Sequence, residues 1–357
     1  MMISPNSQLA FTIPAELAAF EPPERRGIGR DQVRLLVIDR ASEELHHTRF
    51  NHIGEFLTRG DVLVFNRSRT LPASLPGSVS GSEMQSRVRI EVRLAEHLAD
   101  GSWLALILCR DGELFSCDLK AGLEIEFGPG LFATILNRND RIARLWRIRF
   151  SQSGAELIDS IYRFGRPIRY EYVRVPWDLD YYQTVYAQEP GSAEMPSAGR
   201  AFTWRLLFDL RRKGIETTQV VLHTGLSSYE DDEIDSGHPV SEEEYLVAED
   251  AARIINLARE QQRRVIAVGT TVVRALESAV DRDGRVMARH DFTRLKITPD
   301  YQLKVSDGLV TGLHESGASH LEMLSAFVSP ALIGVAYKEA IKRRYLWHEF
   351  GDLSLIV

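Results

Sequence analysis

The sequence predicts a two-part α/β protein, with a main α/β domain at residues 1–74 and 151–357 and an inserted small all-β, barrel-like domain at 75–150. The chain has 357 residues, which is more than one ordinary hydrophobic core organises. Residues 88–150 consist mostly of short alternating runs that Gly and Asp turns separate. On either side of this region, apolar strands alternate with segments of helical spacing, which is the pattern of an α/β domain.

The elements before and within the insertion follow from apolar runs. Residues 35–39 and 61–65 predict two buried strands, and residues 51–57 predict a short helix between them. Four alternating runs predict the strands of the all-β unit. These runs are 88–94, 103–109, 123–127 and 144–150.

After the insertion, the predicted helices and strands alternate. Thr203 predicts the N-cap of a helix that reaches Lys213, because its hydroxyl can accept a first-turn N–H, and Gly214 ends this helix. Ser241 and Glu244 fit a capping box, which predicts that another helix begins there. The other expected elements are strands at 218–223, 265–268, 301–313 and 353–357 and helices at 248–262, 272–281 and 330–345.

The composition excludes several classes of protein. Apolar residues make up 44% of the chain and charged residues 26%, as in soluble globular proteins. No apolar run approaches the roughly 20 residues that a membrane helix needs. The N-terminal segment lacks the basic start and long apolar stretch of a secretory signal, so we expect a cytoplasmic location and no membrane partner.

Neither a metal site nor a disulfide framework is indicated. Cys109 and Cys117 are the only cysteines, and no histidine lies near them at zinc-finger spacing. His314 begins a segment similar to a zinc-protease helix, but the next histidine, His320, lies too far along the chain and Gly317 interrupts the turn. We therefore expect two separate thiols, no bound metal and no prosthetic group.

Charge is distributed unevenly along the chain. The formal net charge is -7, which argues against a protein that is basic over its whole surface. Residues 138–174 nevertheless contain nine Arg, no Lys and four acids, so this segment could hold a phosphate backbone. Residues 228–250 contain ten acids and no Lys or Arg, so this segment would repel a phosphate backbone. Both segments could also be ordinary solvated faces.

One strand-to-helix turn has the features of an anion site. Residues 265–274 read VIAVGTTVVR, a buried strand followed by a glycine turn and the start of a helix. This geometry points backbone N–H groups and the hydroxyls of Thr270 and Thr271 at one spot, where the helix N-terminus favours negative charge. Arg274 could add a bidentate contact to a carboxylate. Gly269 and the two threonines could equally serve only as turn and cap. Phosphate-loop, dinucleotide and hydrolase-elbow motifs are absent.

Short motifs follow one another along most of the chain. YQTVYA occupies 182–187, GSAEMPSAGRAFT 191–203, LHTG 222–225, VIAVGTTVVRALESA 265–279, DGLVTGLH 307–314, SAF 325–327 and FGD 350–352. They resemble YQTVYA, GSVAAPTAGLHFT, LHVG, VIAVGTTSVRxLESA, DALVTNFH, SAF and YGD of the S-adenosylmethionine:tRNA ribosyltransferase-isomerase family, which builds the cyclopentene-diol side arm of queuosine. Asn66, Arg69, Pro72 and Ala73 resemble parts of its LNDTRVIPARL. The chain is identified as a divergent member.

The resemblance implies a reaction. Family enzymes transfer and isomerise the ribosyl moiety of S-adenosylmethionine onto the aminomethyl group of a 7-deazaguanine base in tRNA, with release of adenine and methionine. The sulfonium acidifies the ribose carbon beside it, so the reaction requires a positioned base and no metal. The expected co-substrate is therefore S-adenosylmethionine, and the expected partner is tRNA.

The resemblance also implies site residues. The histidines expected to carry protons are His223, His238 and His314, with His223 first because it follows an apolar strand. The residues expected to bind S-adenosylmethionine are Tyr186, Ser192, Pro196, Ser197, Gly199, Phe202, Gly269, Thr270, Thr271 and Arg274. Tyr186 and Phe202 could face the sulfonium or the adenine. Arg141, Arg144 and Arg147 are expected to contact tRNA.

The departures from the family motifs keep two other functions open. Ala201 and Ser241 stand where the family has histidines, and Arg67 and Ser74 replace an Asp and an Arg. The alternatives are a non-catalytic or repurposed paralogue that binds S-adenosylmethionine or a nucleoside, and an enzyme that cleaves S-adenosylmethionine without RNA.

Overall fold

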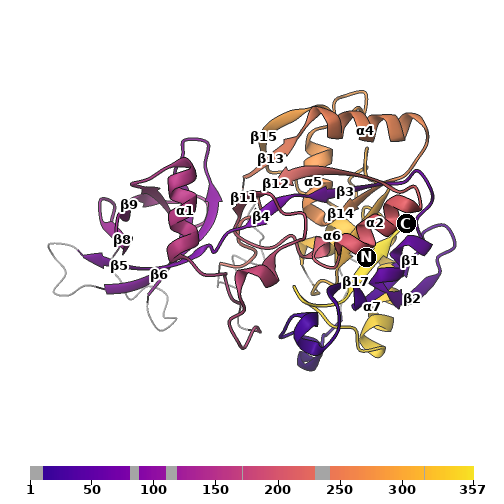
Figure 1. The fold of residues 1–357 in the computed structure, drawn as a ribbon, viewed down its shortest axis with the longest axis horizontal. Helices are drawn as coiled ribbons and strands as arrows, with labels where there is room; N and C mark the ends of the chain where they lie inside the picture. The colour runs from indigo at the N-terminus through magenta and orange to yellow at the C-terminus, as the bar shows by residue number, and fades with distance from the viewer. Residues whose placement is uncertain (1–10, 81–87, 110–118, 171, 230–241, 317) are drawn as a thin grey trace, which may run out of the picture.

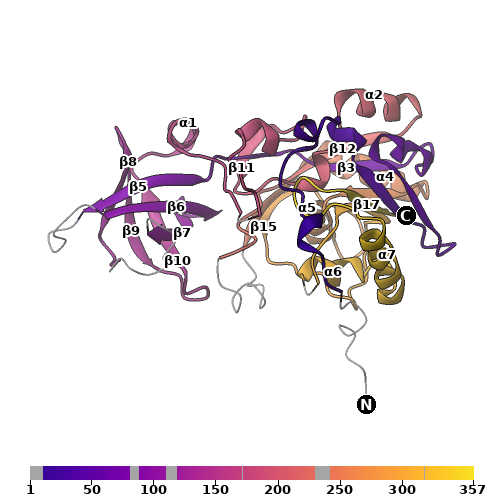
Figure 2. The ribbon, with the colours of Figure 1, turned by 90° about the horizontal axis from the view of Figure 1, so that it is seen from below.

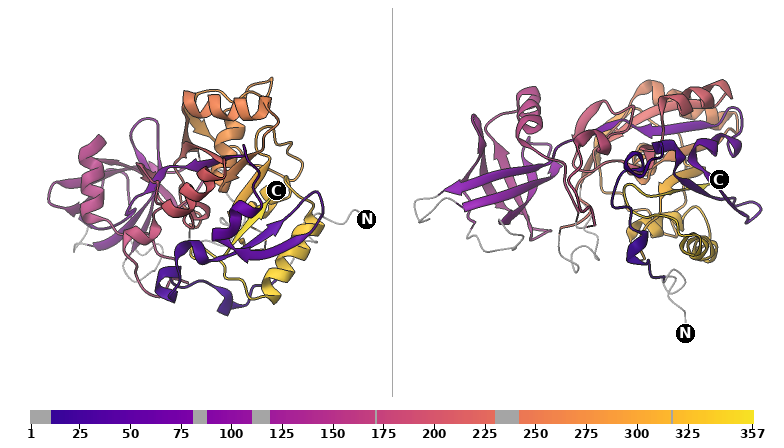
Figure 3. Two further views of the ribbon diagram at one scale, coloured as in Figure 1. Left: turned by 45° about the vertical axis from the view of Figure 1, so that its right-hand side comes forward. Right: turned by 60° about the horizontal axis from the view of Figure 1, so that its bottom comes forward.

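A computed structural model describes residues 11–80, 88–109, 119–170, 172–229, 242–316 and 318–357. They form two bodies along the longest axis of the molecule, a larger one built on a nine-stranded sheet and a smaller one containing a closed barrel (Figure 1). The right-hand view of Figure 3 shows the same two bodies, with several chain segments running between them. The predicted fold class, an α/β domain with an inserted barrel-like β domain, is confirmed.

The larger body is built on a mixed sheet whose four central strands are parallel. These strands, in spatial order, are β12 (Glu216–Leu222), β3 (Val62–Asn66), β14 (Val265–Val268) and β16 (Gly308–Gly312). The flanking strands are β13 (Glu243–Val247) and β15 (Arg289–Thr293) beyond β12, and β17 (Leu353–Ile356), β1 (Arg34–Ile38) and β2 (Leu45–Arg49) beyond β16. β3 and β14 are buried along their whole length, as expected for strands covered on both faces.

Helices cover both faces of this sheet. One face carries α4 (Glu249–Glu260), α5 (Thr270–Ser278) and α7 (Pro330–Lys342), and the other carries α2 (Trp204–Arg212) and the short 3-10 helix η5 (Phe50–Glu55). Val64 belongs to the core on the first face and Phe65 to the core on the second, because successive strand residues point in opposite directions. The hydroxyl of Thr203 accepts a hydrogen bond from the Leu206 N–H at 3.1 Å, which confirms the predicted start of α2.

The smaller body is a six-stranded barrel with its own hydrophobic core. Its strands are β5 (Ser74–Ser80), β6 (Val88–His97), β7 (Trp103–Cys109), β8 (Glu124–Gly128), β9 (Leu131–Arg138) and β10 (Leu145–Phe150). α1 (Gly154–Phe164) lies along one side of the barrel and buries Leu157 and Ile161 against it (Figure 2). Cys109 is disulfide-bonded, which corrects the expectation of two separate thiols.

A two-stranded sheet lies between the bodies. β4 (Ser68–Thr70) leads from β3 towards the barrel, and β11 (Glu189–Ser192) pairs with it in parallel (Figure 1). This pairing brings the segment that contains Ser192 to the end of β3. The remaining α-helix in the described part of the chain is α6 (Ser319–Leu324).

One predicted element is wrong. The capping box was expected to begin a helix at Ser241 and Glu244, but Glu244 lies inside β13 and Ser241 is outside the described residues. Glu243, Tyr245 and Val247 are buried in alternation, and β13 pairs with β12 and β15. The alternation of a strand therefore prevails over the local capping pattern.

Candidate functional site

The four parallel strands end at one edge of the sheet, which is where open α/β sheets place ligands. Asn66, at the end of β3, donates from Nδ2 to the Leu222 carbonyl at 2.8 Å and to the Thr271 hydroxyl at 3.2 Å. Its Oδ1 accepts from the N–H groups of Leu222 at 3.1 Å and Ser68 at 3.0 Å. This buried amide therefore fixes the start of α5 to the ends of β3 and β12.

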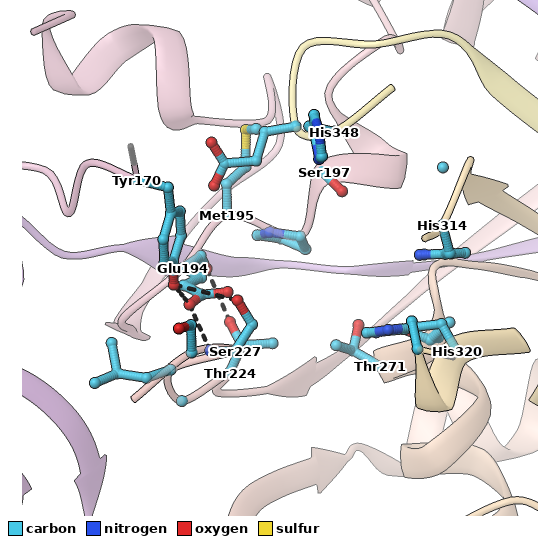
Figure 4. A pocket seen from close by; sticks show the side chains of 18 of the residues that line it. Tyr170, Glu194, Met195, Ser197, Thr224, Ser227, Thr271, His314, His320 and His348 are labelled. Atoms are coloured by element: carbon cyan, nitrogen blue, oxygen red, sulfur yellow. Dashed lines mark hydrogen bonds between the residues drawn. The ribbon is translucent and has the colours of Figure 1, made fainter. Parts of the chain in front are cut away.

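A pocket of about 1750 Å³ opens at this edge and extends between the two bodies. The larger body contributes Gly269, Thr271 and His314 to its lining, and β6 of the barrel contributes Arg89 and Arg93. The pocket is larger than a usual small-molecule site of about 300–1,000 Å³, so it has room for more than one small ligand. Figure 4 shows Tyr170, Glu194 and Ser227 on one side and Thr271, His314 and His320 on the other.

The turn before α5 has the geometry of an anion site. Gly269 has φ +99° and ψ 150°, a backbone conformation that only glycine adopts without strain. The first-turn amides of Thr270 and Thr271 have no partners within the helix and lie at the positive end of its dipole. Arg274, one turn further, forms an ion pair with Glu243. Its guanidinium, expected to hold a ligand carboxylate, therefore already holds a carboxylate of the protein.

Among the histidines, His314 is placed to meet a ligand. It lines the pocket, its Nε2 lies 2.8 Å from the Thr311 hydroxyl, and its ring stacks on His320 with centroids 4.4 Å apart. Burial, with a smaller contribution from the charge of His320, lowers the pKa of His314 well below its usual value. The imidazole is therefore neutral at physiological pH, which is the form of a base.

His223 occupies a different environment, behind the pocket lining. Its Nδ1 lies 2.8 Å from the Ser68 hydroxyl, which in turn lies 2.6 Å from the Ser192 hydroxyl. A Cβ on Gly191 would lie 2.4 Å from this ring nitrogen, so glycine is required beside the ring. Burial lowers the pKa of His223. His238 lies outside the described residues.

Two carboxyl groups with raised pKa values line the same pocket. Burial raises the pKa of Glu194 to about 8 and that of Glu349 to about 7. Each carboxyl also has a tyrosine as neighbour, since Tyr170 donates a hydrogen bond to Glu194 and Tyr172 interacts with Glu349. The motifs did not mark either glutamate. In the family motif GSVAAPTAGLHFT, alanine occupies the position of Glu194. This departure was the one signal in the sequence that could have identified Glu194 as a site residue.

The structure separates the ten residues expected to bind S-adenosylmethionine into two groups. Pro196, Ser197, Gly269, Thr270, Thr271 and Arg274 line the pocket. Tyr186, Ser192, Gly199 and Phe202 lie behind it. Phe202 is fully buried and packs edge-on against Phe65, with ring centroids 4.8 Å apart, and Tyr186 packs against the same ring. Both aromatic rings belong to the core under α2, so they face neither a sulfonium nor an adenine in this pocket.

The arginines expected to contact tRNA are placed unfavourably for that role. Arg144 is buried and donates to the Tyr229 carbonyl at 2.7 Å, and Arg147 pairs with Asp100, so only Arg141 is exposed. Other arginines line the mouth of the pocket and are exposed, and we call them the arginine rim. They are Arg89, Arg166, Arg169 and Arg174. Three of them belong to the Arg-rich segment that the sequence had already marked.

The described part of the acidic run is largely paired. Glu242 pairs with Arg294, Glu243 with Arg274, and Glu244 accepts a hydrogen bond from His290 at 2.6 Å. Across the residues that the structure describes, no group of three or more His, Cys, Asp or Glu side chains could hold a metal ion. Within the same residues, no helix has both the length and the apolar character needed to cross a membrane.

The fold and this pocket define an α/β protein whose ligand site lies at the carboxyl edge of its parallel strands, beside an inserted barrel. The chain belongs to the queuosine biosynthesis protein family, whose sequence profile matches residues 6–356. This confirms the family resemblance inferred from the motifs.

Named relatives match over nearly their whole length. The chain is 35% identical over 364 residues to the S-adenosylmethionine:tRNA ribosyltransferase-isomerase of Caldanaerobacter subterraneus subsp. tengcongensis, with 99% of each chain covered. It is 37% identical over 351 residues to the enzyme of the same name from Heliobacterium modesticaldum, with 97% of this chain and 98% of the relative covered. The crystal structure of S-adenosylmethionine tRNA ribosyltransferase from Thermotoga maritima matches 98% of this chain and 100% of that chain, with 30% identity and a TM-score of 0.55.

Proposed function

We propose that this chain is itself an S-adenosylmethionine:tRNA ribosyltransferase-isomerase. It transfers and isomerises the ribosyl moiety of S-adenosylmethionine onto a 7-deazaguanine base in tRNA. The observation that carries the proposal is the match to enzymes of this name along 97–99% of the chain. S-adenosylmethionine acts as co-substrate without a prosthetic group, tRNA is the partner, and the site of action is the cytoplasm, where tRNA is modified.

S-adenosylmethionine is placed against the turn before α5. Its methionine carboxylate accepts hydrogen bonds from the amides of Thr270 and Thr271, which the helix dipole makes favourable. Arg274 lines the same part of the pocket, and because only its Nη1 pairs with Glu243, its other guanidinium N–H groups can contribute to binding. Ser197 and Pro196 line the adjoining wall.

The tRNA is placed on the arginine rim. Arg89 lines the pocket from β6 of the barrel, and Arg166, Arg169 and Arg174 line it from the segment that follows α1, so these arginines can contact the phosphates that flank a base inserted into the pocket. Inserting the base exposes its aminomethyl group to the co-substrate. The opening between the two bodies thereby becomes the entry for RNA.

His314 is the histidine that we place at the reacting atoms. Its ring is neutral and, with Nε2 engaged by Thr311, its Nδ1 can accept the proton next to the sulfonium. His223 then acts as a positioning residue, because its bond to Ser68 supports the segment that carries Ser192 and Glu194. A role for His238 stays a prediction.

The test is an incubation of the protein with S-adenosylmethionine and a tRNA that carries the aminomethyl-deazaguanine base. Adenine release is followed by chromatography and the tRNA product by mass. Adenine and a heavier tRNA nucleoside, formed only with the modified tRNA, support the proposal. Binding of S-adenosylmethionine without adenine release would instead identify a repurposed binding protein, and adenine release without RNA would identify an RNA-independent enzyme.

A further inference from the structure

Glu194 is a carboxyl group with one oxygen anchored and the other available. Its Oε1 accepts hydrogen bonds from the Ser227 N–H, at 2.6 Å, and from the Tyr170 hydroxyl. The Ser227 hydroxyl donates to the Tyr170 oxygen at 3.2 Å, and the Thr224 hydroxyl donates to the Glu194 carbonyl at 2.8 Å (Figure 4). Among the described residues, no hydrogen bond reaches Oε2. The side chain is therefore held in one orientation with a free acceptor in the pocket.

The surroundings of Glu194 favour a positive charge. Among the described residues, the charged groups that act on Glu194 are the acids Glu349 and Glu243, the latter in β13, and Tyr170 donates a hydrogen bond to it. Glu243 is neutralised by Arg274, whereas no arginine or lysine pairs with Glu194 among the described residues. Glu194 is half-buried, and a desolvated carboxylate without a cationic partner is costly, so a cationic ligand group at Oε2 is stabilised there.

We propose that Glu194 binds the ammonium of the aminomethyl acceptor base and takes one of its protons. This inference rests on the proposed function. The step breaks one N–H bond of the ammonium and forms an O–H bond at Oε2, and no electrons are exchanged. The nitrogen keeps the electron pair of the broken bond as a lone pair, which is the nucleophile that forms the new bond to the ribosyl carbon.

Position and chemistry favour the ammonium over the sulfonium as the ligand of Glu194. Tyr170 adjoins Arg169 of the arginine rim, so Glu194 lies on the wall along which the tRNA base enters. The α5 turn, where S-adenosylmethionine is placed, lies on the opposite wall (Figure 4). An ammonium also donates directed hydrogen bonds to a carboxylate oxygen, whereas a sulfonium has no N–H to donate.

The pH dependence of kcat/KM for modified tRNA tests this role. In the wild type, activity rises with pH as the Glu194 carboxyl ionises, reaches half its maximum near pH 8 and levels off above about pH 9. Glu194→Gln keeps an oxygen for the Ser227 N–H but cannot take a proton. The variant reacts only with tRNA whose amine is already deprotonated. The pKa of this amine is about 10 if it resembles a lysine, so the activity of the variant continues to rise through about pH 10. At pH 7 we expect it to be about 100-fold slower, within the usual range for general bases.

Controls separate this role from charge loss and from misfolding. Glu315→Gln removes an exposed carboxylate from the same pocket and should keep the wild-type profile. Glu194→Ala introduces the alanine of the family motif and should reproduce the glutamine profile. Both Glu194 variants should bind S-adenosylmethionine with wild-type affinity. Wild-type profiles in both Glu194 variants overturn the role of Glu194 but leave the enzyme assignment standing, whereas absence of adenine release from the wild type overturns the proposed function first.

Discussion

Asn66 offers the most direct test of how the site is held together. Its side chain satisfies three buried backbone groups, the N–H and C=O of Leu222 and the N–H of Ser68, and it also bonds to Thr271. Asn66→Ala leaves these three groups without partners, and each unpaired group lowers the free energy of unfolding by about 1–3 kcal/mol. Losses at neighbouring groups are not additive, so we expect a total loss of about 3–5 kcal/mol. That is a large fraction of the roughly 5–15 kcal/mol by which domains are stable.

The assay is urea unfolding followed by circular dichroism, together with calorimetric titration of S-adenosylmethionine. Asn256→Ala is the matched control, because the Asn256 side chain makes two hydrogen bonds with the backbone of Val286, at 2.8 and 2.9 Å, away from the pocket. The control variant should lose about 1–2 kcal/mol of stability and keep its affinity for S-adenosylmethionine. Asn66→Ala should also bind more weakly, since α5 is no longer fixed to β12. A loss below 1 kcal/mol, or equal binding defects in both variants, would refute this reasoning.

Three further predictions concern the turn, the rim and His314. Gly269→Ala should lower the free energy of unfolding by about 1–3 kcal/mol, because a residue with a side chain is strained at φ +99°. The added Cβ meets no atom closer than 3.6 Å, so the loss reflects backbone strain. An unchanged urea midpoint and an unchanged affinity for S-adenosylmethionine would contradict this prediction. Replacing Arg89, Arg166 and Arg169 with Gln should weaken tRNA binding and reduce the slope of log K against log salt by about 2–3. Replacing Arg141, Arg147 and Arg149 should change this slope little, and the opposite result would move the RNA surface to the β10 side of the barrel. His314 resists protonation in the folded state, so acid favours unfolding as the unfolded chain takes up a proton below about pH 6.5. His314→Gln should therefore lose less stability than the wild type between pH 7 and 5. Equal slopes of unfolding free energy against pH in the two proteins would show that His314 titrates normally.

Local signals in the sequence were sufficient for much of the fold. Thr203 caps α2 because a hydroxyl that precedes an apolar helical run can accept a hydrogen bond from a first-turn N–H. The apolar run at β14 and the glycine turn that follows are found as predicted, because Gly269 adopts a conformation that other residues avoid. Glu244 was assigned to a helix because the capping pattern is local, whereas β13 depends on pairing with β12 and β15, which are distant in sequence.

The site was only partly predictable, for a related reason. A motif indicates which residues a family keeps, but not whether a side chain faces the pocket or the core behind it. Phe202 and Pro196 belong to the same motif, yet Phe202 is fully buried under α2 while Pro196 lines the pocket. The arginines posed the same difficulty, since the local charge balance does not show which side chains are exposed. Arg144 bonds inside the protein, whereas Arg166 is exposed and lines the pocket.

The carboxyl groups of the pocket suggest how it accommodates two cationic reactants. With pKa values of about 8 and about 7, Glu194 and Glu349 hold protons for much of the time near neutral pH when no ligand is bound. The empty pocket thereby avoids two unpaired buried charges, which a low-dielectric environment would make costly. A sulfonium or an ammonium stabilises the ionised carboxylates, so each cation that enters lowers these pKa values and releases protons. The charge that a reactant needs is then present only while that reactant is bound, and the pocket needs no permanent partner for either glutamate.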